Sequence, residues 1–161
     1  VYDIKQTGGR KFQALDLLLT GRTRHWKTME RAAKALGIEV AYVKFGLPAT
    51  GRSLGKRIEV QPGLSSMERT ATLAHELGHE LLHQTENQRQ ATMKRPGRRL
   101  TEAEMETEAE ATAYVIMSVL GLPSKAPSYI PWQGGTGLTV LRAMTRVQRA
   151  VKTILEAARA G

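Results

Sequence analysis

His75-Glu76-Leu77-Gly78-His79 is the stretch of sequence that decides the fold and the chemistry of this chain. On a helix, residues i and i+4 lie on one face about 6 Å apart along the axis, so both imidazoles can reach one metal ion. Glu76 projects about 100° round from His75, where its carboxylate can hold a reacting water without being a ligand. This is the arrangement that a zinc hydrolase requires. The alternative is a helix with two solvated histidines.

The residues around this stretch predict a central, buried helix. Ser65-x-x-Glu68 has the form of a capping box, so a helix should begin there and run to about Gln84. Apolar residues fall on two opposite sides of the helical wheel, and a helix that is apolar on both sides is buried. Leu73, Leu77 and Leu81 form one side, whereas His75 and His79 share the other with Ala71, Thr72 and Leu82.

His83 extends the same stripe of histidines, but it needs a different interpretation. It lies about 12 Å along the helix axis from His75. Both side chains cannot bind one ion at about 2.1 Å over that span. We therefore expect His83 to be structural, or to support a metal ligand from behind.

A catalytic zinc takes three protein ligands, so one more donor must come from elsewhere in the chain. The chain has no Cys, and the remaining histidine, His25, lies in a polar stretch. The candidates are therefore acidic, and five glutamates cluster in the ten residues that begin at Thr101. Thr101-x-x-Glu104 is a second capping box, which predicts a helix that runs to about Leu120 and is ended by Gly121.

The apolar face of this glutamate helix narrows the choice of ligand. Glu106 and Glu108 flank the face on either side, while Glu110 lies further round, one turn beyond Glu106. The wheel therefore leaves Glu106 or Glu108 as the ligand and does not choose between them. The other glutamates form a solvated acidic face near the helix N-terminus, where the helix dipole favours them. The predicted core residues are Met105, Ala109, Thr112, Ile116 and Val119.

Several segments together resemble a known family. The histidine stretch is preceded by Thr-Leu-Ala at 72–74 and followed by Glu-Thr-Glu-Ala-Glu-Ala-Thr-Ala-Tyr at 106–114. The opening segment 1–9 and the pattern Tyr129-x-x-Trp132 also fit. Over about residues 1 to 135 the chain resembles the metallopeptidase domain of ArdC-type antirestriction proteins, which are relatives of the ImmA/IrrE metallopeptidases.

The resemblance implies roles for the glutamates. In such zincins the first member of a Glu-x-x-x-acidic/polar pattern binds the metal, which makes Glu106 the ligand in this chain. Glu110 is then a carboxylate that steadies a ligand imidazole. Glu108 and Glu110 remain possible replacements as ligands. The single-stranded-DNA-binding N-terminal domain usual in the family is missing from this sequence.

Length and composition agree with one domain over residues 1–161, which we expect to be excised from a longer protein because it begins at Val1. No stretch approaches the 18 or more apolar residues of a membrane span, and no secretory signal is visible. The absence of cysteine excludes disulfides and thiolate ligands, and is compatible with a cytoplasmic setting, which we expect.

The chain is strongly basic, with a formal net charge of +9, which favours association with polyanions, nucleic acid first. Residues 94–99 form a short basic loop, and residues 137–160 form an amphipathic basic C-terminal helix. Arg142, Arg146 and Arg149 recur on one face of that helix. The first interpretation is a helix that packs its apolar side on the domain and solvates its charges; phosphate contact is the alternative.

The first half of the chain predicts a helix and a small sheet. Residues 26–36 should be helical and are stopped by Gly37. Residues 38–45 are rich in β-forming side chains and should pair antiparallel with residues 57–61, across the glycine-rich segment 46–55. Such a sheet would let an extended peptide add as a strand beside the metal.

Taken together, these features predict a zincin-like α+β domain in which a small antiparallel sheet packs on the histidine and glutamate helices. We expect His75, His79 and Glu106 to hold Zn²⁺, Glu76 to act as the general base, and Tyr129 to be a possible oxyanion stabiliser. The expected reaction is hydrolysis of peptide bonds in a specific protein substrate. The alternatives are a DNA-protecting antirestriction module with structural zinc and no peptidase activity, and a regulatory interaction domain with a vestigial site.

Overall fold

The computed structural model describes residues 19–45, 49–84, 100–124 and 137–160, with side chains in the last range from residue 142. It has the predicted α+β class. Its elements, in chain order, are α1 (His25–Ala35), β1 (Glu39–Tyr42), β2 (Gly51–Ser53), β3 (Arg57–Val60), α2 (Ser66–His79), the π-helical turn η2 (Glu80–Gln84), α4 (Glu102–Val119) and α5 (Gly137–Ala160). Whether residues 1–161 form a single domain stays a prediction.

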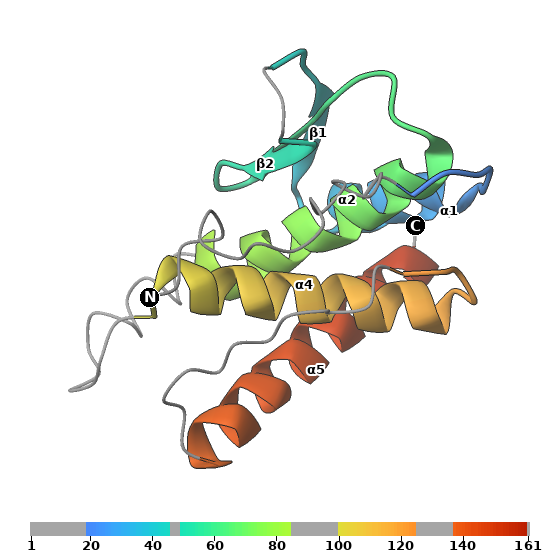
Figure 1. The fold of residues 1–161 in the computed structure, drawn as a ribbon. Coiled ribbons are helices and arrows are strands. Elements are labelled where there is room, and N and C mark those ends of the chain that lie inside the picture. The colour runs from blue at the N-terminus through green and yellow to red at the C-terminus, as the bar shows by residue number, and fades with distance from the viewer. Residues whose placement is uncertain (1–18, 46–48, 85–99, 125–136, 161) are drawn as a thin grey trace, which may run out of the picture.

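Helix α2 is the central element (Figure 1). The sheet lies on one side of it and α4 on the other, and it also contacts α1 and α5. Leu73 and Leu77 on one side are fully buried, and Thr72 on the other is 5% exposed. The prediction of a helix buried on two sides is therefore confirmed, and this position holds the histidine stretch between the sheet and α4.

Both predicted helix starts are confirmed by capping hydrogen bonds. The Ser65 hydroxyl accepts from the Glu68 N–H at 3.1 Å at the start of α2, while the Glu68 carboxylate accepts from the Leu19 N–H at 2.6 Å. At the start of α4, Thr101 and Glu104 make the reciprocal bonds of a full capping box. These caps set the registers that bring the two helices together side by side.

The sheet differs from the predicted antiparallel pair. It has three strands in the order β1-β3-β2, with β1 parallel to β3 and β2 antiparallel to it. The prediction missed β2, because Gly51, Arg52 and Ser53 include no β-branched or aromatic side chain and resemble loop. Because β2 comes between β1 and β3 in the sequence, the chain reverses direction twice, once into β2 and once into β3. Strands β1 and β3 therefore run in the same direction.

Glu80 ties the β2–β3 hairpin to the end of α2. Its carboxylate is 3% exposed and accepts from the Ser53 hydroxyl at 2.7 Å, the Gly55 N–H at 2.8 Å and the Lys56 N–H at 2.7 Å. Gly55 and Lys56 both have positive φ, as the two central residues of a type I′ hairpin turn require. The buried carboxylate thus holds this turn, and β2 with it, against the histidine helix.

Helix α5 confirms the predicted C-terminal helix, but two of its side chains do not lie where the helical wheel placed them. Its buried residues are Ala143, Val147, Ala150, Val151, Ile154 and Ala158. Met144, predicted on the packed side, is 54% exposed. Arg142 and Arg149 are exposed as predicted, but Arg146 turns inward to Glu108 on α4.

No helix in the described part of the chain is long and apolar enough to cross a membrane. The basic loop 94–99 lies outside the described residues.

Candidate metal centre

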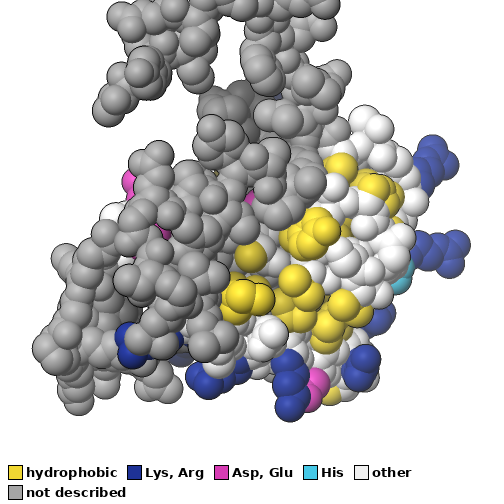
Figure 2. Space-filling view, turned by 60° about the horizontal axis from the view of Figure 1, so that its bottom comes forward, with side chains coloured by type: hydrophobic (Ala, Val, Ile, Leu, Met, Phe, Trp, Pro, Cys, Tyr) yellow, Lys and Arg dark blue, Asp and Glu magenta, His cyan; other side chains and the backbone are white. Residues whose placement is uncertain are grey.

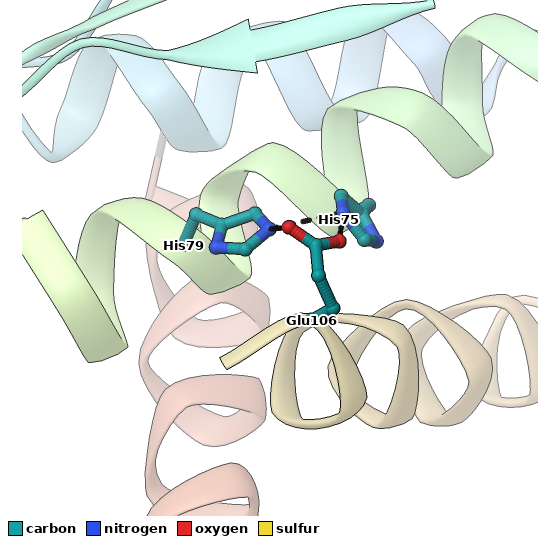
Figure 3. A group of neighbouring side chains, drawn as sticks. All are labelled: His75, His79 and Glu106. Atoms are coloured by element: carbon teal, nitrogen blue, oxygen red, sulfur yellow. Dashed lines mark hydrogen bonds and ion pairs between the residues drawn. The ribbon is translucent and has the colours of Figure 1, made fainter. Parts of the chain in front are cut away.

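Two imidazoles from α2 and one carboxylate from α4 face a common point (Figure 3). The Nε2 atoms of His75 and His79 lie 3.1 Å apart. Glu106 places one carboxylate oxygen 3.4 Å from His75 Nε2 and the other 3.3 Å from His79 Nε2. Because the two histidines are one helical turn apart, both rings lean toward the same stretch of α4.

This donor set suits a divalent metal ion. Donors arranged tetrahedrally at 2.0–2.1 Å from a zinc ion lie about 3.3 Å from one another. In this cluster the two Nε2 atoms are 3.1 Å apart, and each lies 3.3–3.4 Å from a different oxygen of Glu106. With one oxygen taken as the ligand, the three donor atoms all lie within 4.8 Å of one another. Without a cation the cluster would bring two ring nitrogens together beside a carboxylate, and only one of those nitrogens can donate to the other. The residues therefore fit a zinc ion.

The imidazole of His75 is backed by a second carboxylate. Its Nδ1 lies 3.4 Å from an oxygen of Glu110, one turn beyond Glu106 on α4. Burial alone would lower the pKa of His75, but the hydrogen bonds that its ring donates to Glu106 and Glu110 outweigh this effect and raise the pKa to about 9. The same contacts to His75 and His79 hold the pKa of Glu106 well below its usual range. In the metal-free protein these groups form an ion pair at neutral pH.

The outer nitrogen of the His79 imidazole contacts His83 instead of a carboxylate. The Nδ1 atoms of the two rings are 3.0 Å apart, and His83 Nε2 lies 3.0 Å from a carboxylate oxygen of Glu108. Glu108 is 2% exposed and also forms an ion pair with Arg146 of α5. Burial lowers the pKa of His83, which favours its neutral form.

Glu76 is buried beside this cluster, with 6% of its surface exposed. Burial raises the pKa of its carboxyl, although the neighbouring His75 and His79 oppose the shift. Within the described parts of the chain, its carboxylate has no hydrogen-bond partner. A buried carboxylate left without a donor is available to exchange a proton with a molecule in the cleft.

Two glycines let the surrounding backbone come close to the site. A Cβ on Gly51 of β2 would lie 2.6 Å from Thr72 Cγ2 and 2.9 Å from Glu76 Oε1, so the strand runs directly against the Glu76 side chain. A Cβ on Gly78 of α2 would lie 3.2 Å from both Ala109 Cα and Thr112 Cβ of α4. Gly78 therefore allows the close helix contact that brings Glu106 to the two histidines.

The site opens into a cleft of about 650 Å³ between β2, α2 and α4. Its walls include Thr50 and Arg52 from the strand region, His75 and Glu76 from α2, and Glu106 from α4. This volume lies within the range of small-molecule and peptide pockets. The cleft thus gives a ligand access to the face of the cluster that carries Glu76.

The structure brings together most of the residues that the sequence singled out. His75, His79 and Glu106 converge, Glu110 lies behind His75, and Glu76 lies beside them. Glu108, left open as a ligand by the helical wheel, instead contacts His83 and Arg146. Tyr129 lies outside the described residues, so its proposed role in oxyanion stabilisation stays a prediction.

Sequence reasoning missed Glu80, Gly51 and the inward position of Arg146. A signal existed for Glu80, because a glutamate in the apolar end of a buried helix needs donors from elsewhere. Arg146 gave no such signal, since it occurs among other arginines at helical spacing. Its inward turn depends on how α5 packs against α4.

The family model for peptidase M78, described as the IrrE N-terminal-like domain, matches residues 33–153. This range is 121 of the 161 residues and contains the whole cluster. The chain belongs to this family. Searches of the curated proteins and of the solved structures found no match.

Membership agrees with the resemblance to ImmA/IrrE metallopeptidases and supports a metallopeptidase-type function. The match runs from the end of α1 through most of α5, so the sheet and the helix pair belong to the family's domain. In this M78 domain the three convergent side chains form a possible metal site, as expected for a metal-dependent peptidase.

Proposed function

We propose that this M78 domain is a zinc-dependent peptidase that hydrolyses peptide bonds of a specific protein substrate. The observation that carries the proposal is the pairing of a three-donor cluster with the buried, unbonded carboxylate of Glu76 at the floor of an open cleft. Structural zinc sites are closed by four protein ligands, whereas catalytic sites keep one position open. Among the described residues three donors converge beside the cleft, which favours a catalytic site.

His75, His79 and Glu106 would hold the ion. When bound, Zn²⁺ would polarise the scissile carbonyl and lower the pKa of water toward about 7. Glu76 accepts the proton of the attacking water and then delivers it to the leaving amine. In the metal-free protein burial raises the pKa of Glu76. A carboxyl that passes the proton on must not be too acidic, and burial acts in that direction.

Strand β2 gives a place for an extended substrate. It is an edge strand among the described residues, with β3 on one side. Gly51 runs against the Glu76 side chain, so a peptide that adds alongside β2 would pass close to the general base. Main-chain hydrogen bonds to an edge strand bind a peptide with little dependence on its sequence. Selectivity for one protein would then depend on side-chain contacts in the cleft.

The proposal extends to the biological setting that the ArdC-type resemblance suggests. We propose a cytoplasmic peptidase domain of the kind attached to antirestriction proteins of plasmids and phages, with further domains of a longer protein supplying the targeting. A search for cleaved host proteins after expression of the active domain in bacteria would identify the substrate.

The test compares wild type with Glu76→Gln on a proteome-derived peptide library, with new termini counted by mass spectrometry. We expect cleavage by wild type, loss of about 10²- to 10⁴-fold in Glu76→Gln, and one zinc per chain in both. Glu156→Gln makes the same chemical change on the exposed side of α5 and should retain full activity. Equal cleavage by wild type and Glu76→Gln would contradict the proposal, as would failure of zinc-loaded wild type to cleave either the library or any folded protein of a bacterial lysate.

One observation favours a second function, a DNA-protecting module with structural zinc. Figure 2 shows Lys and Arg side chains around the edge of one face. Exposed basic residues include Lys27, Arg31 and Lys34 of α1, and Arg142, Arg149 and Lys152 of α5. This function predicts DNA binding that weakens steeply with salt and survives Glu76→Gln. Absence of DNA binding at low salt would exclude it.

A further inference from the structure

A second set of buried polar side chains lies behind the metal centre. His79 has one ring nitrogen toward Glu106 and the other 3.0 Å from His83 Nδ1. The His83 side chain is 5% exposed and lies in η2, the turn where α2 becomes π-helical. Single π-helical turns are rare and concentrate at functional sites. The position of His83 therefore calls for an explanation beyond packing.

The contacts continue from His83 to two further helices. Its Nε2 is 3.0 Å from Glu108 on α4, and Arg146 on α5 contacts both oxygens of that carboxylate. A buried carboxylate of this kind stays ionised only when cations and donors surround it. Arg146 supplies the charge, and the imidazole of His83 supplies a further donor.

The chemistry of each group fixes the direction of every hydrogen bond from His79 through His83 and Glu108 to Arg146. For His79 Nε2 to bind a metal, its proton must be on Nδ1, which then donates to His83 Nδ1. His83 Nδ1 must therefore be unprotonated, and its proton is on Nε2, which donates to Glu108. Glu108 accepts from both sides because Arg146 keeps it ionised.

We propose that His83, Glu108 and Arg146 form a positioning relay that locks His79 in its metal-binding tautomer and orientation. The inference rests on the proposed zinc centre and adds to it a function for three residues that touch neither metal nor substrate. Such outer contacts fix ring orientation and increase the basicity of the ligand nitrogen. The relay also makes α5 part of the metal centre, although none of the described side chains of α5 belongs to the three-donor cluster.

Nitrogen NMR on the zinc-loaded protein tests the tautomers directly. The chain has four histidines, so labelling with ¹⁵N-histidine gives a spectrum that single His→Gln variants can assign. We expect His79 to carry its proton on Nδ1 and His83 on Nε2. A His83 ring protonated on Nδ1, or on both nitrogens, at pH 7 would overturn the relay.

Zinc affinity, measured by chelator competition, tests its consequence. His83→Leu removes both nitrogens and should weaken zinc binding by about 10- to 100-fold. Glu108→Gln should also weaken zinc binding, but by less than His83→Leu. His83→Gln keeps an acceptor and a donor on one side chain and should recover part of the loss. Ile154→Ala is the matched control, because it removes buried volume from α5 outside the relay and should reduce stability without changing zinc affinity.

The outcomes separate the relay from the metal centre itself. If wild type binds one zinc and both His83→Leu and Glu108→Gln bind it within twofold of wild type, the relay is wrong and the centre stands. If wild type binds no zinc, the centre is wrong and the relay has no function. The free energy of unfolding of each metal-free variant is measured in urea, so that a loss of fold is not taken for a loss of affinity.

Discussion

The two histidines of the metal centre lie one helical turn apart on α2, yet different side chains contact their outer ring nitrogens. His75 lies on an open side, where its outer nitrogen is 3.4 Å from Glu110, whose side chain is 42% exposed. His79 lies on a buried side, where its outer nitrogen is 3.0 Å from His83 and the contacts continue to Glu108. The open side also holds Glu76 and the cleft. We infer that the buried side fixes the geometry and the open side carries out the chemistry.

The largest effect on stability that we expect comes from Glu80→Ala, which removes the anchor of the β2–β3 hairpin. This change leaves the Gly55 and Lys56 N–H groups and the Ser53 hydroxyl without their acceptor. These hydrogen bonds are only part-buried, so water can solvate the freed donors. At about 1 kcal/mol net for each of the three bonds, the free energy of unfolding should fall by roughly 3 kcal/mol. Urea denaturation measures the loss. Glu156→Ala on the exposed side of α5 is the control, and a similar small effect in both variants would show that Glu80 is not an anchor.

Gly78→Ala tests the contact between the two helices. The new Cβ would meet the backbone of Ala109 at 3.2 Å, and the α4 backbone cannot move aside as a flexible side chain can. Overpacking costs about 1–3 kcal/mol, partly offset by the higher helix propensity of alanine. We expect a loss of about 1 kcal/mol in stability together with weaker zinc binding.

The control for this change is Gly37→Ala, where φ is +70° and no atom lies near the new Cβ. It should cost about 1–2 kcal/mol through backbone strain alone and leave zinc affinity unchanged. If Gly78→Ala also leaves zinc affinity unchanged, the close approach of α2 and α4 does not set the position of Glu106.

The difference between the two sides could be predicted only in part from the sequence. The helix starts, the buried position of α2 and the pair of histidines follow from local patterns, namely two capping boxes, an apolar wheel and histidines four apart. The wheel left Glu106 and Glu108 open as the third donor, and the choice of Glu106 came from the family resemblance. The tertiary contacts of Glu108 could not be predicted, because the wheel of α4 places it as close to the core face as Glu106. What separates the two glutamates is the packing of α5, which brings Arg146 to one of them.

The sheet was mispredicted for a related reason. Strand β2 has no apolar periodicity of its own, and its position depends on pairing with β3 and on the Glu80 carboxylate that holds the turn. Long-range contacts of this kind leave no local signal in three residues. The resulting parallel pairing of β1 with β3 is equally invisible in either strand alone.

Glu110→Gln tests the open side and should have a smaller effect than His83→Leu. Glu110 is half exposed, its contact to His75 is longer, and solvent screens its charge. We expect zinc affinity to fall by about two- to fivefold, against about 10- to 100-fold on the buried side. Competition with a chelator gives both values. An effect of Glu110→Gln that equals or exceeds that of His83→Leu would reverse the assignment of the two sides.

The smallest effect is the pH dependence of the metal-free protein. Because the folded pKa of His75 is raised to about 9 from an ordinary 6.5, its ion pair stabilises the fold fully below pH 6.5. That contribution is lost as pH rises toward 9, and exposure of Glu106 keeps it under about 1 kcal/mol. Zinc must displace the same proton, so zinc affinity should rise over this range. Opposite trends in urea stability without zinc and in zinc affinity would bear this out; parallel trends would contradict it.

The most direct test of the metal centre is the zinc content of the protein by native mass spectrometry. We predict one zinc per chain in wild type, no zinc in Glu106→Ala, and one zinc in Glu102→Ala, where the same change is made one turn earlier on α4. A metal-free wild-type protein, or Glu106→Ala that retains stoichiometric zinc, would contradict a centre built from His75, His79 and Glu106.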